Sequence, residues 1–162
     1  MSQQRPEARP VPPGEGTAFW FTTDLYVVKL QSEDTGGAST LAEVTAAPQS
    51  PPLPHMHHNE DEIYYVLDGE FEFMEDDRTF TAGAGSTVYL RKDRFHYHRN
   101  PGDRPARALV LYQPGGIENF VAEAGKPAED PSSLPPSFDE EDIERLVAAA
   151  PKHGFETPPQ SE

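Results

Sequence analysis

The chain of 162 residues contains no cysteine. Disulfides, iron–sulfur clusters, zinc fingers and thiolate catalysis are therefore excluded. Basic residues are also few: 13 lysines and arginines stand against 28 acids, for a formal net charge of −15, and they form no cluster. Without a basic patch, neither nucleic acid nor an anionic membrane surface is an expected partner.

Long apolar runs are missing as well. No stretch approaches the roughly 20 residues that a membrane span needs. Residues 1–7 are polar and lack the apolar segment of a signal peptide. We therefore expect a cytoplasmic protein, an expectation that fits the absence of cysteine.

Proline is abundant at both ends of the chain, and apolar and aromatic residues concentrate between them. This distribution predicts a flexible proline-rich arm at 1–16, one β domain at 17–125 and a proline-rich tail at 126–162. The tail should contain one amphipathic helix, at about 139–150. Its apolar residues need a surface to pack on, which favours a lid over the domain or a brace across a partner subunit over disorder. A further helix is expected at 117–124.

The central part consists of short β-like runs separated by turn signals, of which Asp68-Gly69 is typical of a hairpin. Short strands at this spacing predict an all-β fold, either a barrel or a sandwich. The runs are 18–22, 25–30, 39–45, 62–67, 71–74, 79–81, 86–90, 95–99 and 106–112.

Histidines and one glutamate occur where two of these runs begin. His55 and His57 point to the same face, because side chains alternate along a strand. Glu62 follows at the head of the next run, and His96 lies in a later one. Imidazoles with a carboxylate and no thiolate suit Fe, Mn, Co, Ni or Zn. An exposed histidine pair at a strand end is the plainer reading, and the added glutamate and distant histidine weigh against it.

Three other side chains lie near these residues in the sequence pattern. His58 has the opposite parity to His57 and should face outward or hydrogen-bond to a neighbouring strand. His98 has the parity of His96, so it could line a pocket, although a buried, hydrogen-bonded histidine is more common than another ligand. Tyr64 shares the parity of Glu62 and should face the interior, either to contact a substrate or to fill the core.

Two spaced motifs resemble the signatures of the cupin superfamily. The first, H-x-H-x4-E-x6-G, is complete at His55, His57, Glu62 and Gly69. The second, G-x5-P-x-G-x2-H-x3-N, matches at Gly85, His96 and Asn100 and departs at Arg91 and Asp93, which shape a turn. The resemblance implies a jelly-roll-type β-barrel with a short C-terminal helical extension. It also implies one divalent transition metal per chain, held by His55, His57, Glu62 and His96.

Within that superfamily the chain looks most like the small bacterial quercetin 2,3-dioxygenase-like cupins. This resemblance implies a metal-dependent dioxygenase of secondary metabolism, acting on a flavonol-like or other aromatic or enolic small molecule. Glu62 would be the base and Tyr64 a second catalytic candidate, with no organic cofactor. A non-oxidative polyketide cyclase or isomerase, and a non-catalytic binding protein, are the alternatives. Small cupins commonly pair, so a homodimer is expected by resemblance.

Overall fold

Alternation of buried and exposed side chains along the strands places the core inside a barrel. In the computed structural model, which describes residues 7–159, every second residue of β3 (Thr40–Ala46) is buried and the others are partly exposed. The neighbouring strand β10 (Ala106–Gln113) shows the same period. Such a period is expected of a sheet with one face on the core and one toward water.

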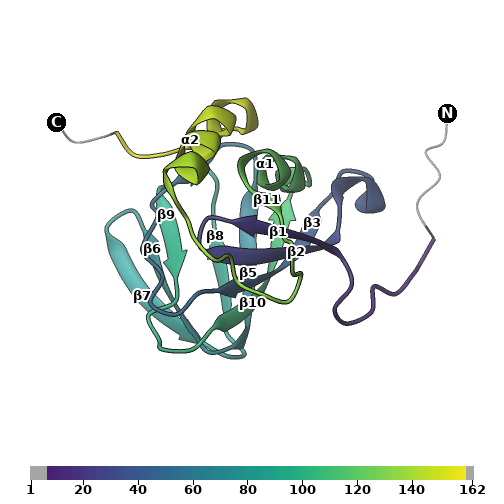
Figure 1. Cartoon of the computed structure of the whole chain (residues 1–162), viewed down its shortest axis with the longest axis horizontal. Coiled ribbons are helices and arrows are strands. Elements are labelled where there is room, and N and C mark those ends of the chain that lie inside the picture. Colours follow the sequence, from purple (N-terminus) through teal and green to yellow (C-terminus); the bar gives the residue numbers. More distant parts are fainter. Residues whose placement is uncertain (1–6, 160–162) are drawn as a thin grey trace.

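The strands form two main sheets and one small one. The largest has the order β11-β1-β2-β3-β10-β5-β8, the second is β7-β6-β9, and a two-stranded sheet pairs β12 with β4. The all-β fold with a short helical extension, predicted above, is confirmed (Figure 1). The remaining bounds are β1 Thr17–Phe21, β2 Asp24–Leu30, β4 Met56–His57, β5 Asp61–Asp68, β6 Glu70–Glu75, β7 Arg78–Gly83, β8 Thr87–Leu90, β9 His96–Arg99, β11 Lys126–Pro127 and β12 Phe155–Glu156.

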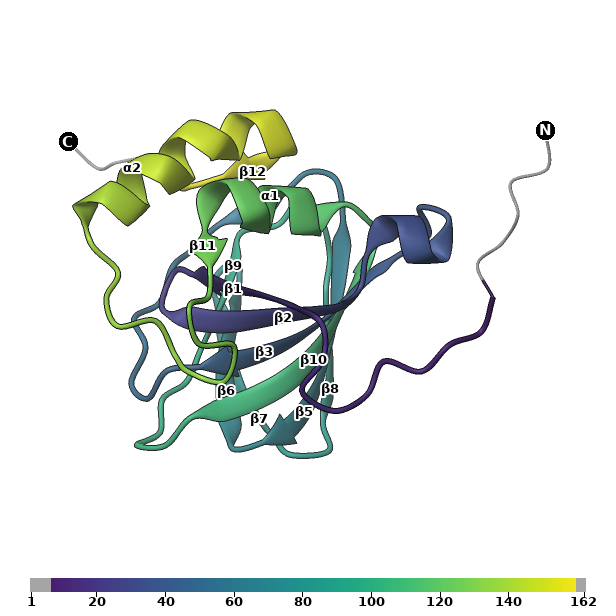
Figure 2. The ribbon, with the colours of Figure 1, turned by 45° about the vertical axis from the view of Figure 1, so that its right-hand side comes forward.

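Two α-helices lie together over one end of the barrel, as both ribbon views show (Figures 1 and 2). Helix α1 (Ile117–Ala124) buries four apolar residues on one face. Helix α2 (Glu140–Ala149) begins at the cap Asp139, and the 3-10 turn η2 (Ala150–His153) follows it; another such turn, η1 (Ser32–Thr35), lies after β2. Across residues 7–159, no helix is long and apolar enough to cross a membrane.

The C-terminal tail is attached to the barrel at both of its ends. Strand β11 pairs with β1, and β12 pairs with β4. Between them, the indole Nε1 of Trp20 donates to the carbonyl of Ser133 at 2.8 Å. The segment assigned from the sequence as a tail thus supplies two strands and lies over the barrel mouth.

Two turns of the cupin-like motifs keep their geometry. Gly69 has φ of +76°, and a Cβ there would lie 2.9 Å from the Cβ of Ala106, so the hairpin requires glycine. Asp93 stands where the motif has glycine, and it adopts φ of 61°. Aspartate is among the residues that tolerate this left-handed conformation. The departure at Asp93 therefore preserves the turn, and its N–H donates to the carbonyl of His57 at 2.8 Å.

Candidate metal centre

The four predicted ligands come from separate parts of the chain and meet inside the barrel. One ligand atom from each of His55, His57, Glu62 and His96 lies within 4.8 Å of the others. His57, Glu62 and His96 are at most 4% exposed. Backbone bonds of 2.9 Å in both directions between His55 and His96 join the two motifs. Strand pairing, and not sequence proximity, thus brings the third imidazole to the first two.

Hydrogen bonds orient two of the histidine rings. Nδ1 of His55 donates to the carbonyl of Leu53 at 2.7 Å, because a carbonyl can only accept. Nδ1 of His57 lies 2.8 Å from the buried carboxylate of Glu60. Each ring then keeps the lone pair of Nε2 free for the cluster. Such an outer partner is typical of metal-binding histidines.

Unsatisfied polar atoms test whether the cluster fits a cation. Among residues 7–159, three buried side-chain atoms have no hydrogen-bond partner: Oε2 of Glu62 and both ring nitrogens of His96. Nε2 of His96 lies 2.8 Å from Oε2 of Glu62 without forming a bond of acceptable geometry. A buried unsatisfied polar atom costs about 1–3 kcal/mol. A divalent cation would satisfy Oε2 of Glu62 and one ring nitrogen of His96, so the residues present fit a metal.

The protonation states of the cluster also suit a cation. Burial, followed by the neighbouring His96 and His57, holds the pKa of His55 well below its usual range. Burial raises the pKa of Glu62, but the adjacent His57 and His96 outweigh it and hold that pKa below normal. Burial lowers the pKa of His57, but Glu62 and Glu60 outweigh it and raise that pKa. His55 is thus held neutral and Glu62 ionised, which are the states in which an imidazole and a carboxylate bind a metal ion.

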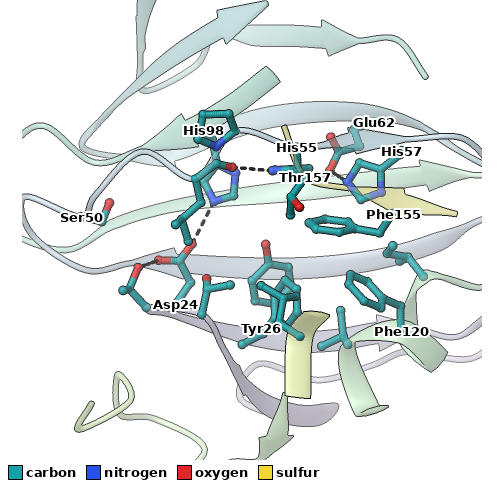
Figure 3. Close-up of a pocket in the computed structure, with 18 of the residues that line it drawn as sticks. Asp24, Tyr26, Ser50, His55, His57, Glu62, His98, Phe120, Phe155 and Thr157 are labelled. Carbon is teal, nitrogen blue, oxygen red and sulfur yellow. Dashed lines mark hydrogen bonds and ion pairs between the residues drawn. The ribbon is translucent and has the colours of Figure 1, made fainter. Parts of the chain in front are cut away.

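A mostly apolar cavity of about 140 Å³ adjoins the cluster (Figure 3). His55, His57 and Glu62 form part of its wall. The apolar part of the wall comes from the barrel mouth, from α1, and from the tail. Its larger apolar members are Phe21, Leu53, Ile117, Phe120, Val121, Leu146 and Phe155.

The tail closes this cavity and touches the cluster. The ring of Phe155 stacks on that of His55, with centroids 4.8 Å apart and planes 15° apart. Its backbone pairs with His57. Nε2 of His58 lies 2.7 Å from the carboxylate of Glu156, so the outward-facing histidine attaches the tail to β4. Of the arrangements considered from the sequence, the structure shows a tail folded over the barrel.

Tyr64 and His98 belong to a hydrogen-bond chain beside the cluster. The buried ring of Tyr64 packs on Phe73, and its hydroxyl lies 3.1 Å from Nδ1 of His98. Nε2 of His98 lies 2.9 Å from the carboxylate of Asp24. His98 and Asp24 line the cavity, whereas Tyr64 is not part of its wall. Tyr64, a catalytic candidate from the sequence, is therefore placed to act through His98 and not on a bound molecule.

Several residues of the site were not identified from the sequence. Glu60 could have been, because a carboxylate three residues after a candidate ligand is a plausible outer partner. Asp24 gave no local signal, since it follows a turn 74 residues before His98. No sequence signal placed Phe155 and Leu146 in the wall of the cavity.

Comparison with known sequences agrees with the fold. Residues 42–112 match the Cupin domain family. An uncharacterized protein of Methanocaldococcus jannaschii is 32% identical over 79 residues, which are 49% of this chain and 63% of that protein. The chain thus spans less than two thirds of that relative's length.

Solved structures show the same fold at low identity. A predicted oxalate decarboxylase from Thermotoga maritima has a TM-score of 0.60 and 22% identity, covering 65% of this chain and 98% of that one. KdgF from Halomonas sp. has a TM-score of 0.52 and 15% identity, covering 72% and 95%. Oxalate decarboxylase from Bacillus subtilis, with Mn(II) centres, has a TM-score of 0.51 and 22% identity, covering 66% and 28%. Residues 42–112 thus match a cupin domain, and these neighbours share the fold of the chain.

Proposed function

We propose that this chain is a metal-dependent dioxygenase that acts on an enolic or phenolic molecule about one ring in size. The observation that carries the proposal is a buried cluster of three histidines and one glutamate that opens into an apolar cavity of about 140 Å³. An engineered apolar cavity of about 150 Å³ binds benzene. A three-ring flavonol is larger than this cavity. We therefore propose a single-ring substrate in place of the flavonol-like substrate that the resemblance to quercetin dioxygenases implies.

The cluster residues divide the work between holding a cation and moving a proton. His55, His57, His96 and Glu62 would hold one divalent ion of Fe, Mn, Ni, Co or Zn. That ion would supply Lewis acidity, which lowers the pKa of a coordinated hydroxyl. Glu62 is the candidate base within the cluster, and its neighbours His57 and His96 keep its carboxylate ionised. We propose that a carboxylate oxygen of Glu62 accepts the proton as the substrate O–H bond breaks.

The apolar wall has a separate role in this proposal. Phe120 of α1 and Phe155 of β12 are aromatic members of the cavity wall (Figure 3). Their rings would exclude water from the deprotonated substrate and lie against its flat faces. Exclusion of water strengthens every electrostatic interaction inside the site.

A non-oxidative isomerase or cyclase is the second candidate. One observation favours it: a second buried carboxylate, Asp24, lines the same cavity. An isomerase must return a proton at a different atom from the one that lost it, and two acid–base groups on one cavity suit that task. A dioxygenase has no such need.

Oxygen uptake decides between the two. Protein loaded in turn with Fe(II), Mn(II), Ni(II), Co(II) or Zn(II) is assayed with single-ring enols and catechols and with one flavonol. We expect oxygen uptake with a single-ring substrate and at least one metal, and little with the flavonol. A metal-dependent product formed equally well under nitrogen would establish the second candidate instead. In Glu62→Gln, the fold loss of turnover should exceed the fold loss of bound metal by at least about tenfold. Unchanged turnover would refute the role of Glu62 as base.

A homodimer, expected by resemblance, remains a proposal. Sedimentation equilibrium of the full chain tests it, and a single species at the mass of one chain would contradict it.

A further inference from the structure

The cavity has a second polar side that the proposed chemistry does not use. Asp24 and Ser50 lie across the cavity from His57 and Glu62 (Figure 3). Asp24 is only 3% exposed and stands at the start of β2. A buried carboxylate is costly unless it is paired, so its position in the wall needs a reason.

One oxygen of Asp24 is firmly held and the other is not. Oδ2 lies 2.9 Å from Nε2 of His98, whose other nitrogen contacts the hydroxyl of Tyr64. Both ring nitrogens of His98 are thus engaged within the protein. The ring therefore positions the Asp24 carboxylate and does not bind a ligand itself. Oδ1 has a longer contact, 3.3 Å, with the hydroxyl of Thr23. A carboxylate oxygen can accept more than one hydrogen bond, so Oδ1 keeps capacity for a ligand.

Charge in the wall restricts what such a ligand can carry. Within the described part of the chain, the residues that line the cavity include no lysine or arginine. The basic neighbour of Asp24 in the wall is His98, and both of its ring nitrogens are already engaged within the protein, so a ligand group next to Asp24 would meet the carboxylate oxygen and no free N–H of His98. A hydroxyl or an amino group can donate to it, whereas a carboxylate or a phosphate would be repelled.

We propose that Asp24 is a specificity residue of this site, which selects substrates with a hydrogen-bond donor at the end remote from the metal and rejects those with an anion there. The inference rests on the proposed function, because it takes the metal-binding oxygen as the other end of the substrate. It narrows the substrate class to small rings with an enolic or phenolic oxygen on one side and a hydroxyl or amino group opposite.

Three matched chelators test the proposal without turnover. Kojic acid, allomaltol and comenic acid share one hydroxypyranone ring and its metal-binding oxygens. Opposite those oxygens they carry a hydroxymethyl, a methyl and a carboxylate group. Each is titrated under nitrogen into the Co(II)-loaded full chain, followed by the visible spectrum of cobalt. Each dissociation constant is corrected for the affinity of that chelator for aqueous Co(II), and dialysis verifies that the protein keeps its metal.

We expect wild-type protein to bind kojic acid about tenfold tighter than allomaltol, as a hydrogen bond to a charged group predicts, and comenic acid the most weakly. In Asp24→Asn the preference for kojic acid should fall to about threefold or less, and comenic acid should gain about tenfold. Asp142→Asn removes a buried carboxylate outside this cavity and should keep the wild-type order.

The wild-type order alone can overturn the proposal, even if Asp24→Asn fails to fold. Comenic acid binding as tightly as kojic acid would overturn it, and so would a folded Asp24→Asn protein with the wild-type order. Absence of oxygen uptake bears on the proposed dioxygenase and leaves this result standing. A protein that takes up no cobalt and binds none of the three would overturn both proposals.

Discussion

Replacement of Glu60 tests whether the cluster is organised as a metal site, because Glu60 touches a predicted ligand without being one. Glu60 is 5% exposed, and its carboxylate lies 2.8 Å from Nδ1 of His57. This bond holds the ring with Nε2 toward Glu62, at 3.7 Å. A charged acceptor also makes the ring a stronger donor to a cation.

The expected loss of metal affinity depends on which interactions each substitution of Glu60 keeps. Loss of an outer partner lowers metal affinity by about tenfold to hundredfold, or about 1.4–2.7 kcal/mol. Glu60→Gln keeps an oxygen that can accept from Nδ1 but loses the charge, so we expect the lower end. Glu60→Leu removes the acceptor and leaves a buried N–H unpaired, so we expect the upper end.

Competition with a chromophoric chelator measures the affinity of each variant, and circular dichroism verifies its fold. The chain offers a matched control: Asp93 contacts Nδ1 of His58 at 2.7 Å, but His58 faces solvent and lies outside the cluster. Asp93→Asn keeps a residue that tolerates φ of 61° and should change the affinity by about twofold or less. Folded Glu60 variants with wild-type affinity would refute the reasoning.

Three further predictions concern the ligands, the tail and acid stability. His96→Ala should lose most of its metal by elemental analysis, and full occupancy would remove His96 from the ligand set. Phe155→Ala should lower the free energy of unfolding in urea by about 3 kcal/mol and admit two-ring substrates; an unchanged size limit would show that Phe155 does not bound the cavity. Burial raises the pKa of Asp142, but bonds from the Asp139 backbone and Lys126 outweigh it and hold that pKa below its ordinary 3.8. Its contribution to stability is therefore present above pH 3.8 and is lost as the pH falls through the folded-state pKa, so thermal unfolding should show an acid-dependent decrease that Asp142→Asn reduces. Identical pH profiles of the two proteins would contradict this.

Much of the candidate metal centre could be predicted from the sequence because its geometry is largely local. His55 and His57 share a face through strand alternation alone, and Glu62 follows in the next strand after a short turn. His96 was a candidate from its place in a later strand, and its assignment as a ligand rested on resemblance to a spaced motif, since nothing local links it to His55, 41 positions away. The structure supplies that link as backbone bonds between His55 and His96.

Strand alternation and turn residues in the sequence determined an all-β chain with two imidazoles and a carboxylate close together, since these features depend on neighbours within a few positions. Only the tertiary structure decided what faces those ligands. Asp24 reaches the cavity because β2 and β9 bring residues 74 positions apart into contact, and Phe155 reaches it because the tail returns to pair with β4. The size of the cavity and the charge on its far wall depend on such distant pairings, which no local pattern of residues encodes.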